Sequence, residues 1–146
     1  MLGVVRLKSA EEGVHEARRE WERKLNCAES VLRGACFAQD VPLADIAKKM
    51  ATPFGGGIGR AEDLCGALSG GVLAIGACIG RLDPDEDKQR CYEAARELHR
   101  RFLETFGATS CRALNKSDFK SPEHRVRCGR LVDGSTRLTI EILRKK

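Results

Sequence analysis

Apolar residues recur at helical spacing along most of the chain, and this periodicity restricts it to a mainly helical fold. In residues 9–29 the apolar side chains stand three or four positions apart, and the pattern continues past Asn26 to Ala35. The cap-like Asn26 allows a break into two helices, with Cys27 at the start of the second. Residues 86–106 carry a second stripe of large apolar side chains that ends at Gly107. We therefore expect an all-α protein, a compact helical bundle in which residues 1–146 form a single domain.

Shorter segments predict further helices between and after these two. Residues 41–50 fit a short amphipathic helix, with Pro42 suited to its first turn. Residues 63–79 are small and apolar and contain four glycines that would let neighbouring backbones approach, so we predict a central packed helix there. Residues 111–114 fit one helical turn, and residues 115–123 a loop.

Residues 131–142 allow two interpretations. The Asp133-Gly134 pair is typical of a β-hairpin, whereas Leu131, Ser135 and Leu138 share one helical face. Because an isolated hairpin is marginally stable and no other strand is evident, we favour a helix and keep a short C-terminal hairpin as the alternative.

The composition narrows the function classes. The net charge of +5 is spread over the chain, and one Trp and one Tyr provide few stacking platforms, so nucleic-acid binding has little support. No apolar run approaches about 18 residues, which argues against a membrane span. We expect a cytoplasmic protein, and seven cysteines in a reducing compartment indicate thiol, metal or cluster chemistry instead of a disulfide framework.

Four of the seven cysteines stand where a thiolate would be favoured. These four are Cys27, Cys65, Cys111 and Cys128. The first three follow residue types that favour helix N-termini, where unpaired N–H groups and the helix dipole stabilise an anionic sulfur. Basic residues surround Cys128 and can lower its pKa. The remaining cysteines, Cys36, Cys78 and Cys91, lack such settings and are expected to be small buried apolar residues.

This cysteine pattern resembles that of a known family. Residues 65–70 read Cys-Gly-Ala-Leu-Ser-Gly, Phe54 and three glycines precede them, and Cys27, Cys111 and Cys128 follow the family's order. Over roughly 26–143 the chain is similar to redox-active proteins that have four separated cysteines and a Cys-Gly-Ala-x-x-Gly motif. The resemblance implies a mostly helical domain with a redox role, and a similar cysteine set accompanies an iron–sulfur centre in split-Soret cytochromes. Those proteins also carry haem, but this chain has no Cys-x-x-Cys-His sequence, so no haem is expected.

Thiolate chemistry points in the same direction. Four cysteine thiolates can hold either a [2Fe–2S] or a [4Fe–4S] cluster, so Cys27, Cys65, Cys111 and Cys128 are the predicted metal ligands. Gly66 and Gly70 would let the backbone approach that cluster, although both glycines could equally serve helix packing alone. His124 could donate to a cluster sulfur or couple a redox step to a proton.

The sequence therefore predicts an electron carrier more readily than an enzyme, with a redox protein as partner. A homodimer is compatible with the sequence. A thiol–disulfide redox protein is the first alternative, but the chain has no Cys-x-x-Cys pair to select the reacting thiols. A zinc-stabilised interaction module is the second, and it lacks the short ligand spacing of zinc knuckles.

Overall fold

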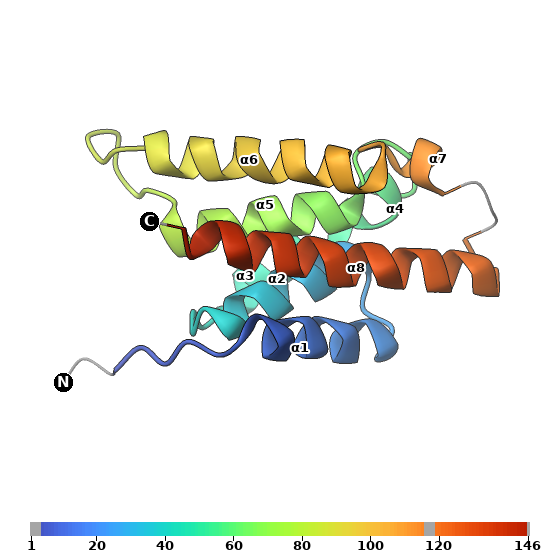
Figure 1. Ribbon diagram of the computed structural model, residues 1–146, viewed down its shortest axis with the longest axis horizontal. Helices are drawn as coiled ribbons and strands as arrows, with labels where there is room; N and C mark the ends of the chain where they lie inside the picture. The colour runs from blue at the N-terminus through green and yellow to red at the C-terminus, as the bar shows by residue number, and fades with distance from the viewer. Residues whose placement is uncertain (1–3, 116–118, 146) are drawn as a thin grey trace.

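The structure is a bundle of helices, as the periodicity predicts (Figure 1). The computed structural model describes residues 4–115 and 119–145, and no strand occurs within those ranges. The helices, with one 3₁₀ turn labelled η1, are α1 (Ala10–Glu22), α2 (Cys27–Ala38), α3 (Asp45–Met50), η1 (Thr52–Phe54), α4 (Gly55–Ile58), α5 (Gly66–Ile79), α6 (Gln89–Phe106), α7 (Cys111–Leu114) and α8 (Pro122–Leu143). The all-α prediction is confirmed.

Helix α8 packs against four other helices of the bundle, α1, α2, α5 and α6. Its buried hydroxyl groups find acceptors, since Ser135 Oγ donates to the Ala67 carbonyl at 2.6 Å and Thr139 Oγ1 to the Ser135 carbonyl at 2.7 Å. The hairpin alternative for residues 131–142 is wrong, because α8 runs through the whole segment. Gly134 lies within this helix with the Phe106 ring directly against its α-carbon, so here the glycine permits close helix packing.

Helices α2 and α5 pack with their backbones close together. A β-carbon at Gly70 would stand 2.6 Å from the Ala28 carbonyl oxygen, so the absence of a side chain is what permits this approach. The predicted packed helix over 63–79 is therefore observed, beginning at Gly66. Because Gly70 lies against Ala28 near the start of α2, the first turns of both helices lie at the same end of the bundle.

Three predicted boundaries shift in the structure. The helix expected over 41–50 begins only at Asp45, so Pro42 precedes it instead of occupying its first turn. The helix expected from residue 86 begins at Gln89. Part of the predicted loop over 115–123 is helical, because Ser121 caps α8 and Pro122 occupies its first position; residues 116–118 lie outside the described residues.

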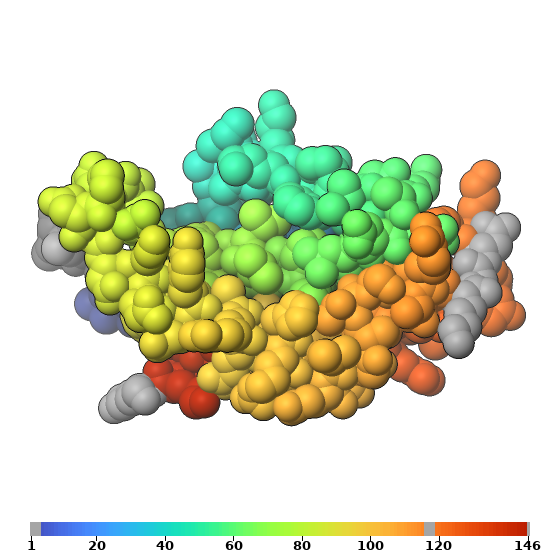
Figure 2. Space-filling view, turned by 90° about the horizontal axis from the view of Figure 1, so that it is seen from above, coloured from blue at the N-terminus to red at the C-terminus, as the bar shows by residue number. Residues whose placement is uncertain are grey.

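The glycine-rich turn, residues 55–59, lies together with α7 at one end of the molecule, and the connection between α5 and α6 lies at the other (Figures 1 and 2). Within the described part of the chain, no helix combines the length and apolar character needed to cross a membrane.

Candidate metal centre

A cavity of about 390 Å³ lies at the end of the bundle where α2 and α5 begin, and four cysteines line it. The four are Cys27, Cys65, Cys111 and Cys128, which are the predicted metal ligands. They come from the first turn of α2, the N-cap of α5, the first residue of α7 and the first half of α8. The other three cysteines do not line this cavity. The structure thus gathers four thiols that are far apart in sequence.

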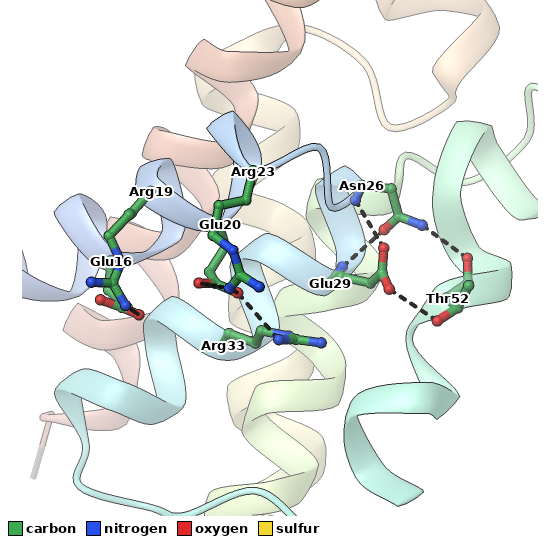
Figure 3. A network of polar contacts seen from close by, with 8 residues as sticks. All are labelled: Glu16, Arg19, Glu20, Arg23, Asn26, Glu29, Arg33 and Thr52. Carbon is green, nitrogen blue, oxygen red and sulfur yellow. Dashed lines mark hydrogen bonds and ion pairs between the residues drawn. The ribbon is translucent and has the colours of Figure 1, made fainter. Parts of the chain in front are cut away.

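Paired caps fix the position of Cys27. The Asn26 side chain accepts the Glu29 backbone N–H at 2.9 Å, and the Glu29 carboxylate accepts the Asn26 N–H at 2.9 Å. Both side chains also reach Thr52, whose carbonyl accepts from Asn26 Nδ2 at 2.9 Å and whose hydroxyl donates to Glu29 at 3.0 Å (Figure 3). This network ties the start of α2 to the segment that leads into the glycine-rich turn.

A second network in Figure 3 anchors α1 on α2. The buried carboxylate of Glu20 in α1 pairs with Arg23 at 2.8 Å and with Arg33 of α2 at 3.2 Å. A buried carboxylate depends on such partners, since its charge would otherwise be costly to desolvate. The contact holds α1 beside the helix that carries Cys27.

The glycine-rich turn forms one wall of the cavity. Gly56 and Gly57 have φ angles of 67° and 72°, in the left-handed region that favours glycine. A β-carbon at Gly57 would lie 2.7 Å from both the Asp63 nitrogen and the Cys111 β-carbon. The turn therefore approaches the Asp63 backbone and the Cys111 side chain closely only because Gly57 has no side chain.

A short backbone pairing brings Cys65 and Cys111 together. The Cys65 N–H donates to the Thr109 carbonyl at 2.8 Å, and the Cys111 N–H donates to the Asp63 carbonyl at 2.5 Å. Ser110 then caps α7 by accepting the Ala113 N–H at 3.1 Å. These bonds join the residues before α5 to those before α7, so both cysteines stand at helix starts that face one cavity.

Helix α8 contributes Cys128 and, one turn earlier, His124. The His124 Nε2 atom lies 3.4 Å from the Cys128 sulfur, and the imidazole is buried with its edge toward the Phe119 ring, 4.9 Å between centroids. The polar surroundings of His15, His99 and His124 in the sequence predict surface positions for all three; the prediction is confirmed for His15 and His99, which are exposed, and is wrong for His124, which the fold buries. His124 is therefore placed to interact with a sulfur of the cavity.

Burial governs the ionisation of these thiols. Burial first, and then the charge of Cys27, raises the pKa of Cys65 to about 12. Burial and the neighbouring thiolates likewise raise the pKa of Cys128 to about 12, against the opposite effect of Arg125 and Arg127. Burial also raises the pKa values of Cys27 and Cys111. Arg125 and Arg127 act in the expected direction on the pKa of Cys128, but burial outweighs them, so the pKa lies above its usual value.

Backbone donors nevertheless point at the sulfurs, as helix starts predict. The N–H groups of Gly56 and Ala28 act on Cys27, and those of Ala67 and Leu68 act on Cys65. Gly66 lines the cavity, and a β-carbon there would overlap the Cys27 sulfur. Gly70 lies one turn further along α5, against Ala28, and does not line the cavity.

Of the aromatic and basic side chains at the cavity, Arg125 is one of the basic residues noted around Cys128, whereas Trp21, Lys24 and Arg60 were not predicted from sequence. The Arg125 guanidinium lies over the Trp21 ring at 4.1 Å from its centroid and donates to the Trp21 carbonyl at 3.1 Å. Lys24 and Arg60 also line the cavity. One signal was available, since Arg125 precedes Cys128 by three positions and therefore shares its helix face.

The comparisons with known proteins agree with this cysteine pattern. The family model described as "Putative redox-active protein (C_GCAxxG_C_C)" matches residues 25–142. The chain therefore belongs to this redox-active family. It is also similar to an uncharacterized protein from Archaeoglobus fulgidus, with 29% identity over 128 residues that cover 82% of this chain and 85% of that protein. No solved structure matches the chain.

Proposed function

We propose that this redox-family protein holds one iron–sulfur cluster through Cys27, Cys65, Cys111 and Cys128 and carries electrons. The observation that supports the proposal is the convergence of these four sulfurs on one cavity of about 390 Å³. Such a cluster accepts and releases single electrons, and four cysteines can hold either a [2Fe–2S] or a [4Fe–4S] centre.

The electrostatics of the cavity fit an inorganic centre. The thiolate charge of Cys27 acts on Cys65, Cys111 and Cys128, so four ionised sulfurs would repel one another here without bound cations. Iron ions would supply the compensating positive charge, and the N–H groups directed at Cys27 and Cys65 would stabilise the anionic sulfurs.

Mononuclear zinc is the metal alternative to a cluster. Across residues 4–115 and 119–145, no three His, Cys, Asp or Glu side chains gather closely enough to hold a single metal ion. Zinc binds sulfur at about 2.3 Å and needs its four ligands around one point.

Nearby side chains suit an electron-transfer site. His124 would donate to the Cys128 sulfur, because its Nε2 atom lies 3.4 Å away, and donors to ligand sulfurs tune cluster potentials. Lys24, Arg60 and Arg125 line the cavity and give its surroundings a basic character. We propose a redox protein with an acidic docking face as the partner, in the reducing cytoplasm that keeps free thiols reduced.

Anaerobic purification tests this proposal. The expected product is a brown protein with iron and acid-labile sulfide, whose visible absorption bleaches on reduction. Cys→Ser at any of the four positions is expected to abolish loading. Cys91→Ser is the matched control, because Cys91 is partly buried and does not line the cavity; it should load like the wild type.

Each alternative has its own outcome. A colourless protein that contains stoichiometric zinc would show that the site is a structural zinc site and not an iron–sulfur centre. A metal-free protein with a reversible two-electron thiol couple would show that the chain is a thiol–disulfide redox protein. Iron loading that survives Cys111→Ser or Cys128→Ser would refute the four-cysteine ligand set.

A further inference from the structure

A second pair of thiols lies between α2 and α5, outside the four-cysteine cavity. Cys36 lies in the apolar cluster between these helices, Cys78 packs against that cluster, and the two thiols are hydrogen-bond partners. Cys36 follows Cys27 by nine positions in α2, and Cys78 follows Cys65 by thirteen in α5. At 1.5 Å per residue, these steps place the second pair roughly 14–20 Å along the helices from the cavity.

The two thiols of this pair differ in their surroundings. Cys36 is buried, with 1% of its surface exposed, whereas Cys78 is only partly buried. The interaction with Cys36 lowers the pKa of Cys78, and the interaction with Cys78, followed by burial, raises the pKa of Cys36. Cys78 is therefore the thiol that ionises first and that a reagent can reach, and the buried Cys36 thiol is its hydrogen-bond partner.

We propose that Cys36 and Cys78 form a second redox site, which a low-molecular-weight disulfide oxidises to an intramolecular disulfide. The Cys78 thiolate attacks one sulfur of the oxidant, which forms a mixed disulfide and releases the first thiolate of the reagent. Cys36 then gives up its proton and attacks the Cys78 sulfur, which forms the Cys36–Cys78 bond and releases the second reagent thiol. Two protein thiols are oxidised and one reagent disulfide is reduced to two thiols.

This bond would cross-link α2 and α5, which begin at Cys27 and Gly66. The two helices already pack closely where Gly70 lies against Ala28. The cross-link closes a loop from residue 36 to residue 78 and is expected to raise the Tm of the protein by roughly 10 °C. It does not require any of the four cavity thiols.

Peptide mapping of the intact protein tests the site. The protein is equilibrated anaerobically at a series of oxidised-to-reduced glutathione ratios, quenched with N-ethylmaleimide and digested with trypsin. The expected product is a disulfide between peptides 34–48 and 61–81, which carry Cys36 and Cys78 and which trypsin releases by cutting after Arg33, Lys48, Arg60 and Arg81. Its fraction should rise as the ratio becomes more oxidising.

Two variants assign the roles within the pair. Cys36→Ala should stop the reaction at a stable glutathione adduct on Cys78, because the resolving thiol is gone. Cys78→Ala should yield neither adduct nor cross-link at Cys36, which is buried. Because peptide 61–81 also contains Cys65, a cross-link that persists in Cys78→Ala would overturn the proposal. Absence of the cross-link from folded wild-type protein at the most oxidising ratio would overturn it as well.

The outcome is independent of the iron–sulfur proposal. Cys91→Ser, the control outside both sites, should keep the cross-link. Iron and sulfide are measured in parallel on the reduced samples, so a protein without iron can still show the 36–78 bond, and an iron-loaded protein can lack it.

Discussion

The α-carbon of Gly66 faces the sulfur of Cys27 so closely that a β-carbon at position 66 would overlap this sulfur. The same β-carbon would stand 3.0 Å from the carbonyl oxygen of Phe54, so little space is open on that side. Cys27 begins α2 and Gly66 begins α5. The missing side chain at position 66 therefore helps to set where the Cys27 thiol lies in the cavity.

Gly66→Ala is expected to displace the Cys27 sulfur and to weaken iron binding about 10-fold or more, as loss of a supporting contact around metal ligands does. Gly76→Ala is the matched control in the same helix, because a β-carbon there meets nothing within 4 Å. That control should load normally and gain up to about 1 kcal/mol in unfolding free energy through helix propensity. Equal iron content in both variants would show that position 66 does not constrain Cys27.

The glycine-rich turn gives a second matched pair of substitutions. Gly57→Ala places a methyl group 2.7 Å from both the Asp63 nitrogen and the Cys111 β-carbon, at a φ of 72°. Gly59→Ala has a similar φ of 56° but meets nothing within 4 Å. We expect Gly59→Ala to cost about 1 kcal/mol of unfolding free energy and Gly57→Ala roughly 2 kcal/mol more, from overlap in a packed site. Denaturant unfolding of the metal-free proteins measures both costs.

Helical periodicity was sufficient to predict most of the fold. The break at Asn26, the end of α6 at Gly107 and the single turn at residues 111–114 all follow from local signals, because caps and glycines act on their own neighbours. The Asp133-Gly134 pair was ambiguous for a different reason. Its local preference for a turn is overridden where α8 packs against four other helices.

The candidate site could be predicted only in part. Helix starts and the family resemblance selected four cysteines that prove to line one cavity. Their raised pKa values were not predictable, because burial is a property of the folded chain. The pairing of Cys65 with Thr109 and the approach of Gly57 to Cys111 also join distant segments, and neither leaves a periodic signal in the sequence.

Removal of bound metal should leave a protein whose stability falls in alkaline solution. The pKa of Cys65 is about 12 in the folded protein, against 9.0 for an unperturbed thiol. Between these pH values the unfolded chain releases the Cys65 proton while the folded chain retains it, so unfolding becomes more favourable as pH rises. The full contribution of this thiol is present below pH 9 and decreases between pH 9 and 12.

Urea unfolding of metal-free protein at pH 8, 9 and 10 measures this decline. Cys65→Ala removes the titrating group, so its unfolding free energy should fall less steeply over the same range. Cys91→Ala retains both Cys65 and Cys128 and should follow the wild type. A Cys65→Ala slope as steep as that of the wild type would assign the decline to other groups.

The chain has two capping boxes, and substitutions in them can distinguish a loss of helix stability from a loss of iron binding at the cavity. Asn26 and Glu29 cap α2 beside the cavity, and Ser9 and Glu12 cap α1 in the same reciprocal way. Asn26→Ala and Ser9→Ala should each cost about 1 kcal/mol of unfolding free energy. Only Asn26→Ala also breaks the hydrogen bond to the Thr52 carbonyl, and so weakens the network that ties the start of α2 to the segment before the glycine-rich turn. Iron content should therefore fall in Asn26→Ala and stay at the wild-type level in Ser9→Ala. Equal losses in the two variants would mean that iron binding follows overall stability and not the position of Cys27.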